Sequence, residues 1–195
     1  VVTASGESTV RVWCGRSAEV KYVLNPMSAA GPSAVVSLSS SNSNGGENHS
    51  DMGRNIHTVI PLHTPANTMI IVPRGPKAYL VTCSGIIIRL FENESVITAD
   101  KDKTSGGGGH KGDFVAATVS PSNKWLYAVT DGGSCLCFDV ASGKVEQMIR
   151  DFAYETVGGK PNIEVSGVTH HPLKGMIAAY SSSHALKRGL LTVWK

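Results

Sequence analysis

The two ends of the chain carry variants of one short phrase, and this recurrence constrains the fold more than any other feature. Residues 1–13 are VVTASGESTVRVW, and residues 176–194 are MIAAYSSSHALKRGLLTVW. Each phrase contains a short apolar strand, a polar turn, and an alternating β-branched strand that ends on tryptophan. Alternation of this kind predicts β-strands, and its return at a distance predicts a repeat architecture.

The sequence between these phrases consists of short alternating or apolar runs separated by turn residues, which predicts an all-β fold. The predicted strands group along the chain as three, four, four and three. Four anchor residues, Trp13, Val81, Phe138 and Trp194, recur at intervals of 68, 57 and 56 residues. Without the intervening loop insertions each interval is roughly 40 residues, the length of one four-stranded β-propeller blade.

Three segments interrupt the strand pattern. Residues 28–55 are rich in Ser, Gly and Asn and lack aromatic residues, residues 100–112 contain SGGGGHKG, and residues 152–162 contain Gly158-Gly159 and Pro161. A segment of the first kind buries too little apolar surface to offset the entropy lost on ordering. We therefore predict flexible insertions at 28–55, 100–112 and 152–162.

The third strand group carries the clearest motifs, namely GHKGDFVAATVSP and CLCFDVASGK. This group resembles the WD40 repeat, with Phe138-Asp139 at the Trp-Asp position, and Trp13-Cys14 and Trp194-Lys195 hold that position without the Asp. The resemblance implies an all-β, WD40-type β-propeller, here a partial ring of about three and a half four-stranded blades. Residues 1–195 would form the C-terminal portion of one propeller, which upstream residues or another chain would complete, because a half ring leaves two open strand edges.

A closer resemblance rests on GDFVAATVSPSNKWLYAV, CLCFDVASGKVE and GVTHHPLKGMIAAYSSS with the final GLLTVWK. These stretches look like the C-terminal blades of the suppressor-of-mec-and-unc family of nuclear splicing factors. The resemblance implies a non-enzymatic scaffold of pre-mRNA splicing, acting in the nucleus within the spliceosome before activation. The implied partners are other spliceosomal proteins, including a RED-type protein bound through regions outside this chain. The alternative is a peptide-recognition propeller of another pathway, such as a ubiquitin-ligase substrate receptor.

Composition narrows the function classes only slightly. The net charge of +3 neither demands nor excludes an RNA partner, and no apolar run is long enough for a transmembrane helix. Cys135 and Cys137 would face one side of a strand, but no second Cys/His pair at zinc-like spacing accompanies them. We predict buried thiols rather than a metal site, and we predict no cofactor and no catalytic residue.

Basic residues gather in the loops that a propeller would place on one face. As a functional site this basic rim would dock an acidic peptide or an RNA backbone, and the favoured alternative is that these are solvated loop charges. The absence of interleaved aromatic residues argues against the RNA version. The candidate rim residues are Arg74, Lys77, Lys101, Lys103, Lys111, Lys160, Lys187 and Arg188, with His110 beside them.

The remaining candidates are structural. The WD40 resemblance implies that Trp13, Phe138 with Asp139, and Trp194 anchor the packing between blades. It also implies that His110 and Asp131 hydrogen-bond to brace a blade, although Asp131 lies one residue further from its aromatic than the pattern requires.

Overall fold

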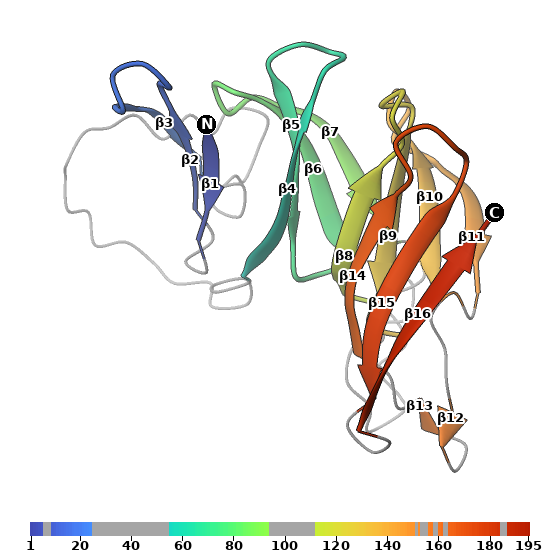
Figure 1. Ribbon diagram of the computed structural model, residues 1–195. Helices are drawn as coiled ribbons and strands as arrows, with labels where there is room; N and C mark the ends of the chain where they lie inside the picture. The colour runs from blue at the N-terminus through green and yellow to red at the C-terminus, as the bar shows by residue number, and fades with distance from the viewer. Residues whose placement is uncertain are drawn as a thin grey trace, which may run out of the picture.

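The computed structural model describes residues 1–5, 9–24, 55–93, 112–150, 152, 156–157, 160–161, 164–183 and 187–195. Over these residues the chain is all-β, with four antiparallel sheets of three or four strands and one two-stranded ribbon (Figure 1). The all-β prediction is confirmed. Within the same residues there is no helix of the length and hydropathy that crossing a membrane requires.

Each sheet is built from strands that follow one another in the sequence. The first sheet contains β1 (Val2–Ala4), β2 (Val10–Trp13) and β3 (Val20–Leu24). The second sheet contains β4 (Ile56–Leu62), β5 (Thr68–Pro73), β6 (Lys77–Thr82) and β7 (Ile87–Glu92). Sequential pairing needs only short turns, which the Gly, Asn, Pro and Ser clusters between the strands supply.

The second half of the chain repeats this design. The third sheet contains β8 (Phe114–Val119), β9 (Trp125–Thr130), β10 (Cys135–Asp139) and β11 (Val145–Ile149). The fourth sheet contains β14 (Glu164–His170), β15 (Ile177–Ser183) and β16 (Arg188–Trp194). In the sequence between these two sheets, β12 (Thr156–Val157) and β13 (Lys160–Pro161) form the two-stranded ribbon.

The sheets follow one another across the molecule, each packed on the next (Figure 1). Strand β8 lies between β4 and β14, so the opening strands of the last three sheets are neighbours, and β1 contacts β4. This arrangement is compatible with the partial ring predicted from the sequence.

A one-residue bulge recurs in the outer strand pair of the first three sheets. In the third sheet the register of β10 and β11 shifts immediately before Phe138, where the outer strand carries one extra residue. Equivalent shifts precede Trp13 and Val81 in the first and second sheets. The fourth anchor, Trp194, pairs with β15 as Phe138 pairs with β9. The four anchor residues therefore hold equivalent positions in four sheets.

A second bulge recurs in the inner strand pair of the last three sheets. The opening strand of each sheet skips one residue near its start, and the skipped residues are His57, Val115 and Ser166. A bulge redirects a side chain that regular pairing would place in the ladder. The three sheets therefore share an irregularity at one end of their innermost strands.

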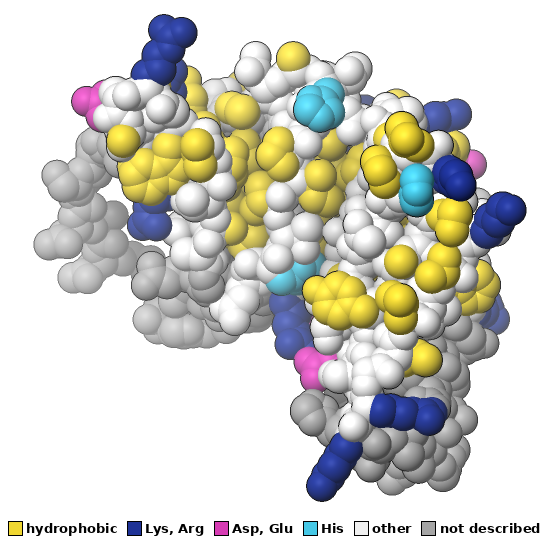
Figure 2. All heavy atoms as spheres, viewed as in Figure 1, with side chains coloured by type: hydrophobic (Ala, Val, Ile, Leu, Met, Phe, Trp, Pro, Cys, Tyr) yellow, Lys and Arg dark blue, Asp and Glu magenta, His cyan; other side chains and the backbone are white. Residues whose placement is uncertain are grey.

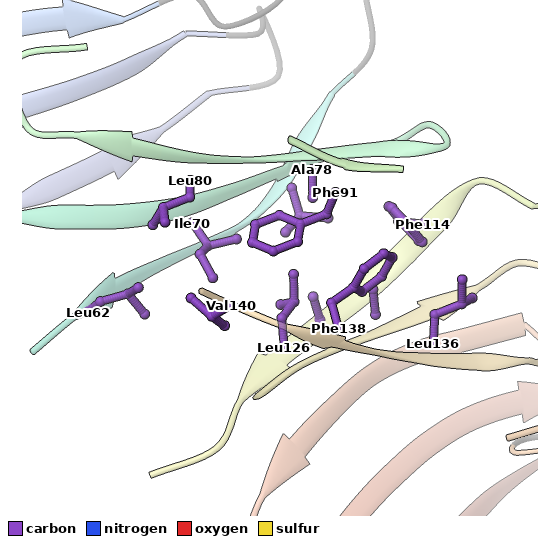
Figure 3. Close-up of a cluster of buried hydrophobic side chains, with 13 residues drawn as sticks. Leu62, Ile70, Ala78, Leu80, Phe91, Phe114, Leu126, Leu136, Phe138 and Val140 are labelled. Atoms are coloured by element: carbon purple, nitrogen blue, oxygen red, sulfur yellow. The ribbon is translucent and has the colours of Figure 1, made fainter. Parts of the chain in front are cut away.

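The core consists of apolar layers between successive sheets. Figure 3 shows the layer between the second and third sheets, where Phe138 is fully buried with its ring centroid 5.5 Å from Phe91 and 6.0 Å from Phe114, both edge to face. Aromatic pairs of this geometry stabilise a core by about 0.5–1.5 kcal/mol beyond their buried area. A second layer joins the first and second sheets around Met69, and a third joins the third and fourth sheets around Val129.

Five residues of the predicted insertion 152–162 are described, namely 152, 156–157 and 160–161. They include the β12–β13 ribbon, and the Phe152 ring is fully buried and stacked on Trp194 at 5.5 Å between centroids. The Trp194 Nε1 also donates a hydrogen bond to the Phe152 carbonyl at 3.0 Å. The apolar ring of Phe152 gains burial against the fourth sheet. The other two predicted insertions, apart from Asn55 and Gly112, lie outside the described residues.

Candidate functional site

The bulged ends of the innermost strands surround a hollow of about 310 Å³. It is lined by residues of β4, β8, β14 and β15, namely His57, Thr58, Val115, Ala116, Ala117, Ser166, Gly167, Val168 and Tyr180. All three skipped residues are among them, so the same bulges that interrupt the ladders shape the hollow. Bulges are frequent beside functional sites because they re-aim side chains in this way.

His57 contributes the imidazole of this hollow, and both of its ring nitrogens have partners. Nε2 lies 3.1 Å from the Phe114 carbonyl oxygen, which can only accept, so Nε2 carries the proton. Nδ1 lies 2.7 Å from the Thr58 hydroxyl and accepts from it. Since Phe114 belongs to β8 and His57 to β4, this imidazole joins the second sheet to the third.

The environment of His57 keeps the imidazole neutral. Burial lowers the pKa of His57, the hydrogen bond to Phe114 opposes this effect, and the positive charge of Arg74 lowers the pKa further. A group whose pKa is lower in the folded state stabilises the fold above its unfolded pKa, and this contribution is lost as the pH falls. The two hydrogen bonds of His57 therefore stabilise the fold most near neutral pH, where the imidazole is uncharged.

We therefore expect acidification below about pH 6.5, the ordinary histidine pKa, to destabilise the chain partly through His57. The check is the free energy of unfolding by urea at several pH values, in the wild type and in His57→Gln. The variant should show a flatter profile between pH 7 and pH 5, whereas Leu173→Gln, a non-titrating change in an exposed turn, should keep the wild-type slope. Equal slopes in the wild type and His57→Gln would contradict the prediction. Because the pKa of Asp131 is raised in the folded state, its protonation on acidification stabilises the fold. This effect is the same in all variants, so it cancels when their slopes are compared.

Sequence reasoning did not single out His57. It belongs to no motif, and its position depends on a one-residue register shift that leaves no periodic signal in the sequence.

Asp131 and Arg74 lie at the same end of the sheets as the hollow. The Gly75 carbonyl accepts from the Phe114 N–H at 2.7 Å, which ties the β5–β6 turn to the start of β8. Burial, followed by the nearby Asp113 carboxylate, raises the pKa of Asp131, while backbone hydrogen bonds from Gly112 and Gly132, and then Arg74, lower it. One carboxylate oxygen of Asp131 is buried without a hydrogen-bond partner among the described residues. The predicted brace partner His110 lies outside those residues.

Four of the predicted rim residues lie at the end of the sheets that carries the hollow. Arg74 is exposed in the β5–β6 turn, and Lys187 and Arg188 are exposed at the start of β16. Lys77 is paired with Glu92, with 3.2 Å between Nζ and Oε1, so its charge is partly neutralised. Lys101, Lys103 and Lys111 lie outside the described residues, as does the side chain of Lys160.

The predicted anchors differ in their surroundings. Phe138 is buried between the second and third sheets, and Trp194 packs on Phe152 beside the layer between the third and fourth. Trp13 is only half-buried, and its Nε1 donates to the Thr3 hydroxyl at 2.8 Å. The Asp139 carboxylate accepts from the backbone N–H groups of Ala141 and Ser142, which shapes the turn before β11. Hydrogen bonding to Ser142 is the main cause that lowers the pKa of Asp139.

Cys135 and Cys137 are both buried in β10. Burial raises the pKa of the Cys135 thiol to about 12 and also raises that of Cys137. Because the thiolate is the metal-binding form, these thiols are poor ligands at neutral pH. Across the residues that the structure describes, no three His, Cys, Asp or Glu side chains are grouped so as to hold a metal ion.

No model of a known protein family matches the chain.

Proposed function

We propose that the chain forms part of a WD40-type β-propeller that acts as a non-enzymatic scaffold in pre-mRNA splicing, within the nuclear spliceosome before activation. The observation that carries the proposal is the repetition of one sheet design, with an outer bulge before the anchor residue in the first three sheets and an inner bulge in the opening strand of the last three. The sequence resemblance described above supplies the pathway.

The geometry of the hollow favours a binding role over catalysis. Both nitrogens of His57 are engaged in hydrogen bonds, so neither is free to take a proton from a substrate. The other polar side chains lining the hollow are the hydroxyls of Thr58, Ser166 and Tyr180. These hydroxyls, together with the imidazole, can form hydrogen bonds with a bound peptide.

The partner surface that we propose is the end of the sheets that carries the hollow. The exposed cations Arg74 and Lys187 lie in turns at this end, and they would attract an acidic segment of another splicing protein. A RED-type protein would bind through regions outside this chain, so its contacts would be separate from this surface.

The test is affinity purification of the tagged full-length protein from nuclear extract, followed by identification of the recovered proteins. We expect components of the spliceosome before its activation. Recovery of ubiquitin-ligase subunits instead would favour the substrate-receptor alternative, and recovery of neither class would overturn the splicing assignment.

A charge-reversal pair tests the surface itself. Arg74→Glu with Lys187→Glu should reduce recovery of the directly bound partner several-fold. The matched control is Lys124→Glu with Lys174→Glu, because these exposed lysines lie in the β8–β9 and β14–β15 turns at the opposite end. Equal losses in the two double variants would show that net charge, rather than this surface, governs the recovery.

A further inference from the structure

The fourth sheet exposes an apolar face. Tyr180, Leu191 and Val193 are 55%, 68% and 53% exposed. With Ala178 they form one face of β15 and β16, since Tyr180 is opposite Leu191 and Ala178 is opposite Val193. Hydrophobic side chains are visible over these two strands in Figure 2. We call these four residues the Tyr180 face.

The register shows what the equivalent positions do in the third sheet. Val129 is opposite Cys135 and Tyr127 is opposite Cys137, as the members of the Tyr180 face are opposite one another. Val129 and Cys135 are fully buried in the layer against the fourth sheet, and Tyr127 packs on that layer.

The second sheet follows the same rule. Its residues Ile70 and Leu80, again directly opposite each other, are buried against the third sheet. The corresponding pair in the first sheet, Val2 and Val12, packs against the second sheet. In three successive sheets, therefore, this face is covered by the sheet that follows. In the fourth, it is covered by no sheet among the described residues.

The first sheet has the complementary face, which is covered by no sheet in the part of the chain that the structure describes. In the second sheet, Met69 and Ile71 pack against the first sheet. In the third sheet, Leu126 and Phe138 pack against the second. The equivalent face of the first sheet is formed by Val1, Thr3, Arg11 and Trp13, which we call the Trp13 face. Val1 is 76% exposed, Thr3 is exposed, and Arg11 and Trp13 are half-buried.

We propose that the Tyr180 face of one copy of this chain packs against the Trp13 face of a second copy, head to tail. Every interface between sheets within the chain joins these two kinds of face, so the two open faces are the halves of one more such interface. Two copies with four sheets each would give eight sheets, within the range of about 4–8 blades in propellers. A head-to-tail contact made twice closes a ring when its rotation fits.

The inference rests on the sheet repeat within the proposed function and not on the splicing role. The self-association experiment can therefore fail while the purification from nuclear extract succeeds, and the reverse also holds.

The first experiment measures the mass of the purified chain of residues 1–195 by light scattering after size exclusion, at several concentrations. We expect a species of twice the 20.5 kDa chain. Leu191→Lys should lower its association constant at least tenfold, since a lysine there must be desolvated in the contact. Leu173→Lys is the matched control, because Leu173 is 89% exposed in the turn between β14 and β15. Circular dichroism verifies the fold, and Val193→Lys replaces Leu191→Lys if that variant unfolds.

The second experiment tests the head-to-tail geometry. Thr3→Lys, on the Trp13 face, should also give a monomer. A mixture of Thr3→Lys and Leu191→Lys should again form a pair, because each supplies the intact face that the other lacks. A monomeric wild type, or a dimer that survives Thr3→Lys, would overturn the proposal. Open-ended oligomers would overturn the closed pair of two copies.

Discussion

Replacing Phe138 by alanine should lower the free energy of unfolding by about 3–5 kcal/mol, the usual cost of removing a buried phenylalanine ring. Phe138 is fully buried, and its ring meets Phe91 of the second sheet and Phe114 of its own sheet edge to face. The alanine variant leaves a cavity at the place where the Phe138 ring contacts both of these rings. Since small domains are stable by only about 5–15 kcal/mol, the loss should be evident in equilibrium unfolding by urea.

The matched control is Val145→Ala, which truncates the residue directly opposite Phe138 on the outer strand. Val145 is 41% exposed, so its loss should change the free energy of unfolding by less than about 1 kcal/mol. If Phe138→Ala cost no more than Val145→Ala, the layer between the second and third sheets would not carry the stability that we assign to it.

The fold was largely predictable because strand and turn chemistry agree along most of the chain. Within the motif GHKGDFVAATVSP, the run FVAATV forms the strand Phe114–Val119, which ends directly before the Ser-Pro turn. The β12–β13 ribbon was missed because its two-residue strands are too short for any period to register. Phe152 does lie outside the strands, but its burial was not predicted, because a single aromatic residue in a loop gives no periodic signal.

The candidate site was much less predictable than the fold. The hollow depends on bulges at His57, Val115 and Ser166, and a shift of one residue in pairing exchanges the two faces of a strand. The ion pair between Lys77 and Glu92 also depends on register, since the two residues are opposite each other on β6 and β7. The sequence identifies the basic residues, but it does not show which of them form ion pairs in the folded chain.

Phe152→Ala should weaken the attachment of the fourth sheet to the third, with a loss of about 3–5 kcal/mol in the free energy of unfolding. The Phe152 ring is fully buried among residues of both sheets and stacks on Trp194 with an interplanar angle of 18°. Removing the ring exposes the Trp194 indole to water, so its fluorescence emission should shift to longer wavelength. Replacing Trp13 and Trp125 by phenylalanine leaves Trp194 as the single reporter, since the chain has three tryptophans.

Leu173→Ala in the same background is the control, because Leu173 lies in an exposed turn of the fourth sheet and should change neither stability nor emission. The stability loss and the spectral shift should occur together in Phe152→Ala, since one ring is responsible for both. A destabilised variant with unchanged Trp194 emission would separate them, and the stacking would then not be what fixes the fourth sheet. Loss of the fourth sheet would also remove the Tyr180 face, so Phe152→Ala should associate as weakly as Leu191→Lys.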